Sequence, residues 1–543
     1  MSPQPVRRRG ADALVRSLEA AGVKRLFALS GNHIMPVFDA VFDSPIELLH
    51  TRHEASAVHM ADAWSRITGT VGIALVTGGP GHANAVSALY TARMAEAPVV
   101  LLSGHAPHDQ LGRGAFQEMR QADMAAPVCK AAWICADAGD VAADVAKAIR
   151  IARSGRPGPV HLSLPTDVLE TAADPSPPEP AAFEAESLPL DGGVAVALRE
   201  RLARAERPMI LVGPACMTRP MRSLTAALER VAGVPVIGME SPRGIADASL
   251  GAFAQMLGRA DCVLLIGKRL DFTLKFGSAP AFPAEAEVHQ IDAEPAEIER
   301  SRRALGDRLH LTALADAGSA LRGLAQVAHK GAASSWLEEV RAALAYRPAA
   351  WDDARAAAAG RLHPVQMLRP LQAVLDGHAD SVLVCDGGEI GQWAAACLNP
   401  PHRVINGVAG SIGSGLPYAL AARCAVADAP VLAIMGDGTV GFHVAEFDTA
   451  VRYGLGLVCL VGNDARWNAE YQIQLRDYGP GRSIGCELLP TRYDAVAQAF
   501  GAYGEHVTDA AALLPAVRRA VASGLPACVN VMIEGLPAPQ IRR

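Results

Sequence analysis

Residues 431–464 read VLAIMGDGTVGFHVAEFDTAVRYGLGLVCLVGND. The stretch opens with a short, unbroken apolar run at 431–435 and closes with a second one at 455–461, as parallel strands buried on both faces do. Apolar residues at helical spacing lie between the two runs and predict a helix over 441–452. We therefore expect a strand–helix–strand unit of a parallel sheet here.

A carboxylate follows each of these two strands, Asp437 after the first and Asp464 after the second. Because neighbouring parallel strands end at the same edge of a sheet, we expect the two side chains to lie close together. Hard oxygen ligands beside a glycine-rich turn and a helix N-terminus suit Mg²⁺ bridging a diphosphate. A strand-end aspartate that only caps a helix is the simpler reading of Gly436-Asp437-Gly438 taken alone.

The same stretch resembles the signature of the thiamine diphosphate enzymes, in particular the branch that holds acetolactate synthase, benzaldehyde lyase and 2-hydroxyacyl-CoA lyase. Their signature is Gly-Asp-Gly, a spacer and Asn-Asn. The second Asn is Asp464 here, which keeps an oxygen ligand but adds a negative charge near the phosphates. The resemblance implies Mg²⁺ binding by Asp437, Asp464 and the main-chain carbonyl of Arg466. It also implies cofactor contacts by Gly436, Asp437, Gly438, Thr439 and Asn463.

Composition limits the class of protein. The chain has 543 residues, enough for about three domains, with 50% hydrophobic and 20% charged residues, as in a globular protein. A formal net charge of −6 gives no reason to expect a nucleic-acid or membrane partner. The 10 cysteines form no Cys-x-x-Cys pair, so we expect reduced thiols. With no signal peptide and no membrane-length apolar run in the sequence, a cytoplasmic location is predicted.

Two breaks divide the chain. Residues 171–193 are rich in Pro, Ala and acidic residues and predict an exposed linker, and residues 327–364 predict a connecting helix and loop. Arg7-Arg8-Arg9 is predicted to be a solvated tail. Strands are expected at 26–29, 71–76, 99–102 and 160–164; at 209–212, 234–237, 262–266 and 288–291; and at 382–385, 431–435, 457–461 and 528–533.

Short apolar strands that alternate with helices predict an α/β fold with three doubly wound parallel-sheet domains, at residues 1–172, 190–328 and 360–543. By resemblance these are the pyrimidine-binding, middle and diphosphate-binding domains. The resemblance further implies that the first and third share one fold.

The first segment carries the candidate catalytic residues. Glu54, in TRHEASAVHMADAWSRITG, is predicted to lie in the first turn of a helix, where a carboxylate is often only a cap. By resemblance Glu54 instead hydrogen-bonds N1′ of the cofactor's aminopyrimidine and so activates the cofactor. His33 and Gln117 match residues that act on the substrate oxygen in relatives, although a lone histidine is more often a core or surface residue. Gly79 belongs to a glycine-rich turn that resembles the loop beside the pyrimidine ring.

In the third segment, INGVAGSIGSGLP holds Gly410, whose carbonyl is implied to receive the cofactor's 4′-amino group, and Ile412, implied to wedge between its two rings. CDGGEIGQW occupies the place of a second diphosphate loop. Its Gly388 and Glu389 are candidate contacts, although Glu389 and Ile390 replace polar phosphate contacts of acetolactate synthase.

In the middle segment, GKRLDF resembles a nucleotide-binding string of acyl-CoA-handling members and makes Lys268 and Arg269 candidates for ADP or CoA phosphate contacts. A solvated Lys-Arg pair is the alternative. No flavin is expected, because the Gly-Met-His-Gly element that acetolactate synthase uses around FAD is not visible in the sequence.

The implied function is a thiamine diphosphate- and Mg²⁺-dependent lyase or carboligase that works through an enamine (acyl carbanion) intermediate on a small-molecule carbonyl substrate. His33 and the lack of a flavin motif favour 2-hydroxyacyl-CoA or 2-hydroxy ketone substrates. An acetolactate synthase-type carboligase or decarboxylase of 2-ketoacids is the alternative. A non-catalytic, cofactor-binding partner subunit is a remote alternative. The resemblance also implies a homodimer or homotetramer with sites between subunits. Acceptor, stereochemistry and the direction of the reaction are left open.

Overall fold

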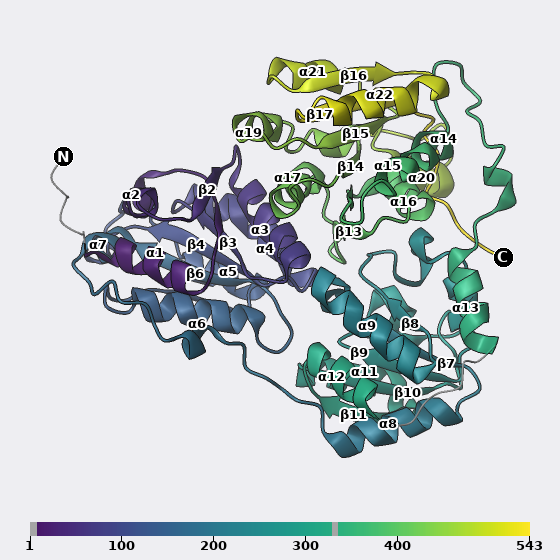
Figure 1. Ribbon diagram of the computed structural model, residues 1–543, viewed down its shortest axis with the longest axis horizontal. Helices are drawn as coiled ribbons and strands as arrows, with labels where there is room; N and C mark the ends of the chain where they lie inside the picture. Colours follow the sequence, from purple (N-terminus) through teal and green to yellow (C-terminus); the bar gives the residue numbers. More distant parts are fainter. Residues whose placement is uncertain (1–7, 328–334) are drawn as a thin grey trace. The chain divides into compact units, whose positions relative to one another are not determined.

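The computed structural model describes residues 8–327 and 335–543 and contains three parallel β-sheets (Figure 1). The chain divides into two compact units between Ser187 and Leu188, the first with one sheet and the second with two. Helices cover both faces of each sheet, so the predicted α/β fold with three parallel-sheet domains is confirmed.

The first sheet has the strand order β2-β1-β3-β4-β6-β5. Its strands are β1 (Arg25–Ala28), β2 (Glu47–His50), β3 (Gly72–Val76), β4 (Val99–His105), β5 (Ala131–Ile134) and β6 (Val160–Pro165). Its helices are α1 (Gly10–Ala20), α2 (Met35–Phe42), α3 (Glu54–Thr68), α4 (Pro80–Met94), α5 (Gln121–Ala125), α6 (Val141–Arg153) and α7 (Thr166–Glu170). α1 packs on α6, and α3 packs on α4.

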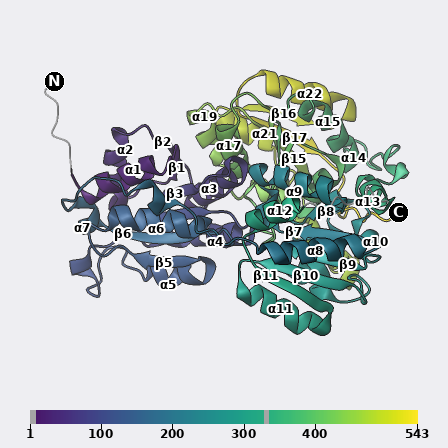
Figure 2. The same ribbon diagram turned by 60° about the horizontal axis from the view of Figure 1, so that its bottom comes forward.

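The middle sheet has the order β11-β10-β9-β7-β8. Its strands are β7 (Pro208–Val212), β8 (Val236–Gly238), β9 (Cys262–Ile266), β10 (Glu287–Asp292) and β11 (Leu309–Leu314). Its helices are α8 (Gly192–Arg204), α9 (Arg219–Ala232), α10 (Phe253–Leu257), α11 (Pro295–Leu305), α12 (Ala317–Gln326) and α13 (Ser335–Ala345). α8, α9 and α12 contribute to the core on one face (Figure 2), and α10 and α13 to the core on the other.

The third sheet has the order β13-β12-β14-β15-β17-β16. Its strands are β12 (Val382–Cys385), β13 (His402–Ile405), β14 (Val431–Gly436), β15 (Val458–Asn463), β16 (Tyr503–Val507) and β17 (Ala527–Met532). Its helices are α14 (Pro364–Leu368), α15 (Gln372–Leu375), α16 (Gly388–Cys397), α17 (Gly415–Ala425), α18 (Asp437–Val440), α19 (Glu446–Arg452), α20 (Asn468–Tyr478), α21 (Tyr493–Ala499) and α22 (Ala510–Ala522). Counted within its own domain, its strand order is the same as that of the first sheet, as the resemblance implied.

Five strands escaped prediction: β2, β5, β11, β13 and β16. All five are edge strands. An edge strand is covered less completely than a central one, and these five are partly exposed along much of their length, so they lack the continuous apolar run that marked the central strands.

Two local predictions were wrong. The helix expected at 441–452 begins only at Glu446, because the preceding segment turns so that His443 Nδ1 lies 2.8 Å from the Gly413 carbonyl oxygen. The segment predicted as a linker at 171–193 is exposed along most of its length, and Phe183 is buried against the first domain's core. Arg9 is not a solvated tail, because it forms ion pairs with Asp12 and Asp39; Arg7 lies outside the described residues.

The segment expected to connect the second and third domains contributes to the middle core. Trp336 and Val340 of α13 are buried against the middle sheet, and residues 328–334 lie outside the described part. Within the described residues, no helix is both long enough and apolar enough to cross a membrane. None of the ten cysteines, all of which the structure describes, forms a disulfide.

Candidate functional site

A cavity of about 230 Å³ opens at the carboxyl edge of the third sheet. It lies where the chain reverses direction across the sheet, because β12 is flanked by β13 on one side and β14 on the other. Open α/β sheets bind their ligands at such a switch point. Its lining includes most of the predicted cofactor and metal residues of this domain: Gly388, Glu389, Gly410, Ile412, Gly436, Asp437, Gly438, Thr439, Asp464 and Arg466.

The structure brings the two predicted carboxylates together. β14 and β15 are parallel neighbours with Gly436 opposite Gly462, so Asp437 and Asp464 leave the sheet side by side. Burial raises the pKa of Asp437 to about 6. Burial, and then the charge of Asp437, raises that of Asp464 to about 8. The Asp437 Oδ2 atom is buried and has no hydrogen-bond partner among the described residues.

These features fit a bound cation. Two buried carboxylates repel each other unless a positive charge lies between them, and a divalent oxygen-seeking ion supplies that charge. The described residues contain no cluster of three or more His, Cys, Asp or Glu side chains with metal-binding geometry. Arg466, whose main-chain carbonyl is the third predicted ligand, lines the same cavity.

The Gly436-Asp437-Gly438 turn is held in shape by Thr439. The Thr439 hydroxyl lies 3.1 Å from both the nitrogen and the oxygen of Gly436. Glycine is required at 438, since a Cβ there would lie 2.7 Å from the ring of Trp467. The turn thus presents bare backbone to the cavity, which favours close approach of a phosphate.

Asp386 is a residue that sequence reasoning missed. It is 2% exposed, and its carboxylate accepts hydrogen bonds from Gly387 N at 2.6 Å, Gly413 N at 3.0 Å and Gly415 N at 2.9 Å. Burial raises its pKa to about 6, opposed by these three N–H groups. Asp386 thereby ties the end of β12 to the loop that carries Gly410 and Ile412. Two of its three partners, Gly413 and Gly415, lie far away in sequence, which is why the motif did not reveal it.

Glu389 forms an ion pair across the rim of the cavity. Its carboxylate lies 3.2 Å from the Arg243 guanidinium of the middle domain. Burial raises the pKa of Glu389, and Arg243 opposes this shift.

The predicted contact of Asn463 is not supported, since its amide points to Thr491 and Asn530 and away from the cavity. In a strand alternate side chains face opposite sides, so Gly462 and Asp464 line the cavity and Asn463 does not.

In the first domain Glu54 is the first residue of α3. Its side chain is 9% exposed, and its Oε2 accepts a hydrogen bond from Asn84 Nδ2 of α4 at 3.1 Å. A Cβ at Gly81 would lie 3.3 Å from its Oε1, so glycine there leaves the carboxylate open on that side. Glu54 is therefore a fixed, nearly buried acid at a helix N-terminus.

The other three first-domain candidates lie between regular elements: His33 in a short 3-10 turn after β1, Gly79 between β3 and α4, and Gln117 in the loop between β4 and α5. His33 is 3% exposed, its Nδ1 lies 3.3 Å from Thr77 Oγ1, and its ring stacks on Phe116 at 5.9 Å. Burial lowers the His33 pKa. Gln117 has a positive φ of 57°, and a Cβ at Gly79 would lie 2.8 Å from its Cβ. The backbone of Gly79 therefore packs directly against the side chain of Gln117.

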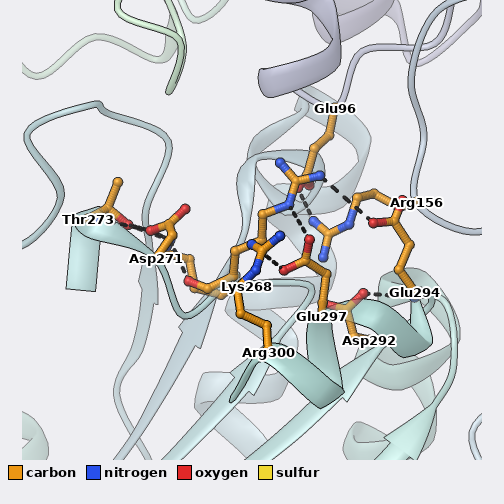
Figure 3. A network of polar contacts seen from close by, with 10 residues as sticks. Glu96, Arg156, Lys268, Asp271, Thr273, Asp292, Glu294, Glu297 and Arg300 are labelled. Carbon is orange, nitrogen blue, oxygen red and sulfur yellow. Dashed lines mark hydrogen bonds and ion pairs between the residues drawn. The ribbon is translucent and has the colours of Figure 1, made fainter. Parts of the chain in front are cut away.

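In the middle domain the two candidate phosphate contacts make internal contacts. Lys268 is 2% exposed, and its ammonium lies 2.6 Å from Thr273 Oγ1 and 3.0 Å from the Arg269 carbonyl (Figure 3). Arg269 pairs with Glu297 at 3.3 Å. Both side chains stabilise the turn after β9, which leaves neither an ammonium nor a guanidinium directed freely at a nucleotide.

Comparison with protein families matches all three domains. The models for the N-terminal, central and C-terminal domains of thiamine pyrophosphate enzymes match residues 8–124, 196–324 and 386–531. A solved thiamine diphosphate-dependent 4-hydroxybenzoylformate decarboxylase from Rhodococcus jostii RHA1 has the same fold. Its TM-score is 0.81 at 21% identity, covering 97% of this chain and 99% of that one.

Curated relatives carry two kinds of name. A probable acetolactate synthase of Mycobacterium bovis is 33% identical over 535 residues, which is 96% of this chain and 95% of that protein. The human 2-hydroxyacyl-CoA lyase 2 is 31% identical over 581 residues, 97% of this chain and 90% of that protein. The chain therefore belongs to the thiamine pyrophosphate enzyme family and is an enzyme of the acetolactate synthase and 2-hydroxyacyl-CoA lyase group.

Proposed function

We propose that the protein is a thiamine diphosphate- and Mg²⁺-dependent lyase or carboligase that cleaves or forms a C–C bond next to a carbonyl or hydroxyl carbon of a 2-hydroxyacyl-CoA or 2-hydroxy ketone. The observation that carries the Mg²⁺ and diphosphate assignment is the buried Asp437–Asp464 pair at the strand ends of the third sheet. The cofactor, when bound, supplies an electron sink for the carbanion left by C–C cleavage.

The chain's own residues have distinct roles in this proposal. Asp437, Asp464 and the Arg466 carbonyl would hold Mg²⁺, and the Gly436–Thr439 turn would bind the phosphates through its backbone. Ile412 and the Gly410 carbonyl, which line the same cavity, would contact the rest of the cofactor. Asn84 holds the Glu54 carboxylate in one orientation, so that the acid can exchange a proton with the pyrimidine ring.

A second, larger cavity supports a substrate longer than a small 2-ketoacid. It measures about 870 Å³ and adjoins the first, sharing Arg243, Glu389, Gln392 and Ala469 with it. It is also lined by the C-terminal residues 537–542. Drug-sized ligands fill sites of about 300–1,000 Å³, whereas the reacting part of a 2-ketoacid is far smaller. The extra space suits a substrate with a long non-reacting part.

The proposal is tested with enzyme loaded with thiamine diphosphate and Mg²⁺. One sample receives a 2-hydroxyacyl-CoA and a parallel sample receives pyruvate, and mass spectrometry identifies the products. We expect formyl-CoA and an aldehyde from the thioester. Acetolactate or carbon dioxide from pyruvate, with no turnover of the thioester, would instead establish the second candidate, a 2-ketoacid carboligase or decarboxylase. The acetolactate synthase relatives motivate that candidate.

His33→Ala is expected to lower kcat by about 100-fold, the usual contribution of one acid–base side chain. Because burial lowers the His33 pKa, its imidazole is neutral near pH 7 and can accept a proton from the substrate hydroxyl. The measurement is kcat together with cofactor affinity, which should not change. His108→Ala is the matched control, because His108 is a partly exposed histidine of the same domain. Unchanged kcat in His33→Ala would remove His33 from the mechanism.

We further infer domain boundaries at residues 1–172, 190–328 and 360–543, with α13 added to the middle domain because its side chains lie in that core. A homodimer or homotetramer with sites formed between subunits, and a cytoplasmic location, remain predictions. The absence of disulfides among the ten cysteines supports the proposed cytoplasmic location, because thiols are kept reduced in the cytosol. Sedimentation of the loaded enzyme measures the oligomeric state.

A further inference from the structure

Gln121 is a fully buried residue at the start of α5 that belongs to none of the recognised motif positions. Its Oε1 accepts a hydrogen bond from Gly79 N at 2.8 Å. Its Nε2 donates to the Gly104 carbonyl at 3.1 Å and to Ser163 Oγ at 3.1 Å. One side chain therefore joins the ends of β3, β4 and β6.

These partners fix the orientation of the Gln121 amide. Gly79 N can only donate and the Gly104 carbonyl can only accept. If the amide were rotated by about 180°, its NH₂ group would face the donor Gly79 N and its oxygen would face the Gly104 carbonyl oxygen, so both hydrogen bonds would be lost. Ser163 Oγ lies 3.3 Å from His161 Nε2. Burial keeps the His161 pKa well below its ordinary value, so this ring is neutral. The Ser163 hydroxyl oxygen has two lone pairs and can accept from Gln121 Nε2 whichever His161 nitrogen carries the proton.

The two glycines held by Gln121 are the ones that touch the candidate catalytic side chains. A Cβ at Gly104 would lie 2.6 Å from the Cβ of His33, and one at Gly79 would lie 2.8 Å from the Cβ of Gln117. There is no spare room at either contact. A shift of the Gly79 or Gly104 backbone therefore moves Gln117 or His33 directly.

We propose that Gln121 is a positioning residue that holds His33 and Gln117 in their reactive places through Gly104 and Gly79. The proposal rests on the function proposed above for these two side chains. Gln121 itself does not touch the substrate; it sets the distance between two groups that do. Misplacing a catalytic group by about 1 Å can cost on the order of 100-fold in rate, so the effect should appear mainly in kcat.

The test compares Gln121→Met with Gln121→Glu. Gln121→Met keeps the length of the side chain but removes all three hydrogen bonds, and kcat should fall by about 10- to 100-fold with little change in KM. Gln121→Glu can accept from Gly79 N, but it can donate to Gly104 only when protonated, so its kcat should rise relative to wild type as the pH falls. The titratable groups around this position are His82, His105 and His161. Because they are common to all variants, their effect cancels in the ratio to wild type.

Gln290→Met is the matched control, since Gln290 is also fully buried but its amide has no hydrogen-bond partner among the described residues. Hydrogen–deuterium exchange at the Gly79 amide needs no turnover and separates this proposal from the function itself. Faster exchange in Gln121→Met supports the holding contact even where no substrate has been found. Unchanged Gly79 exchange, wild-type kcat in Gln121→Met, or an equal loss in Gln290→Met would overturn it.

Discussion

Glu54→Gln is expected to lower kcat by about 1,000-fold while leaving the fold intact, because glutamine keeps the shape of the side chain but cannot exchange a proton. The carboxylate lies at the N-terminus of α3, held by Asn84 and left open on the side of Gly81. The measurement is kcat with whichever substrate the product analysis proposed above identifies. The rate at which the C2 proton of the bound cofactor exchanges with deuterium, followed by NMR, provides a second readout.

The control for Glu54→Gln is Glu47→Gln, a glutamate of the same domain that is exposed and paired with Arg25. It should leave both rates unchanged. Turnover near the wild-type level in Glu54→Gln would end the role proposed for Glu54. If instead no donor is turned over by the wild-type enzyme although it binds the cofactor tightly, the non-catalytic partner subunit becomes the better interpretation.

The sequence predicted the central strands well because their signal is local. Strands such as 382–385 and 262–266 are buried on both faces and read as continuous apolar runs, and the structure has them at the same residues. The edge strands β2, β5, β11, β13 and β16 carry no such run, because one side of an edge strand has no neighbour. Their position depends on pairing with a distant strand, which a local pattern does not record.

The same distinction separates the site residues that were predicted from those that were missed. Asp437 and Asp464 were identified because the strand that precedes each one is visible in the sequence. Asp386 and Gln121 were missed because their roles lie in hydrogen bonds to backbone groups far away in sequence, such as Gly413 and Gly79. Nothing about an isolated Asp or Gln distinguishes a residue that holds two loops from one that caps a helix. Only the folded chain brings the partners together.

The middle domain shows the limit of a local motif. GKRLDF placed a Lys-Arg pair after a strand, which is correct, but the string does not say where the side chains point. Asp271 and Thr273 lie close to the Lys268 ammonium and compensate for the burial of its charge (Figure 3).

Asp437→Asn is expected to change stability in opposite directions in the apo and the loaded protein. In the apo protein Asp437 and Asp464 are buried like charges, so removing one charge at pH 8 should raise the free energy of unfolding by roughly 1–3 kcal/mol. In the loaded protein the same change removes the negative charge of a Mg²⁺ ligand and leaves only a neutral amide oxygen. Wild type at 100 times its Kd should gain about 2.7 kcal/mol from cofactor and metal, and the variant should gain less.

Thermal unfolding with and without thiamine diphosphate and Mg²⁺ measures both effects in one experiment and needs no substrate. Asp428→Asn, an exposed aspartate of the same domain, is the control and should behave as wild type in both states. A variant that is merely misfolded would lose stability in both states, so the inversion of sign separates a metal ligand from a structural residue. If Asp437→Asn is destabilised without the cofactor and is stabilised by it as much as wild type, Asp437 does not hold the cation.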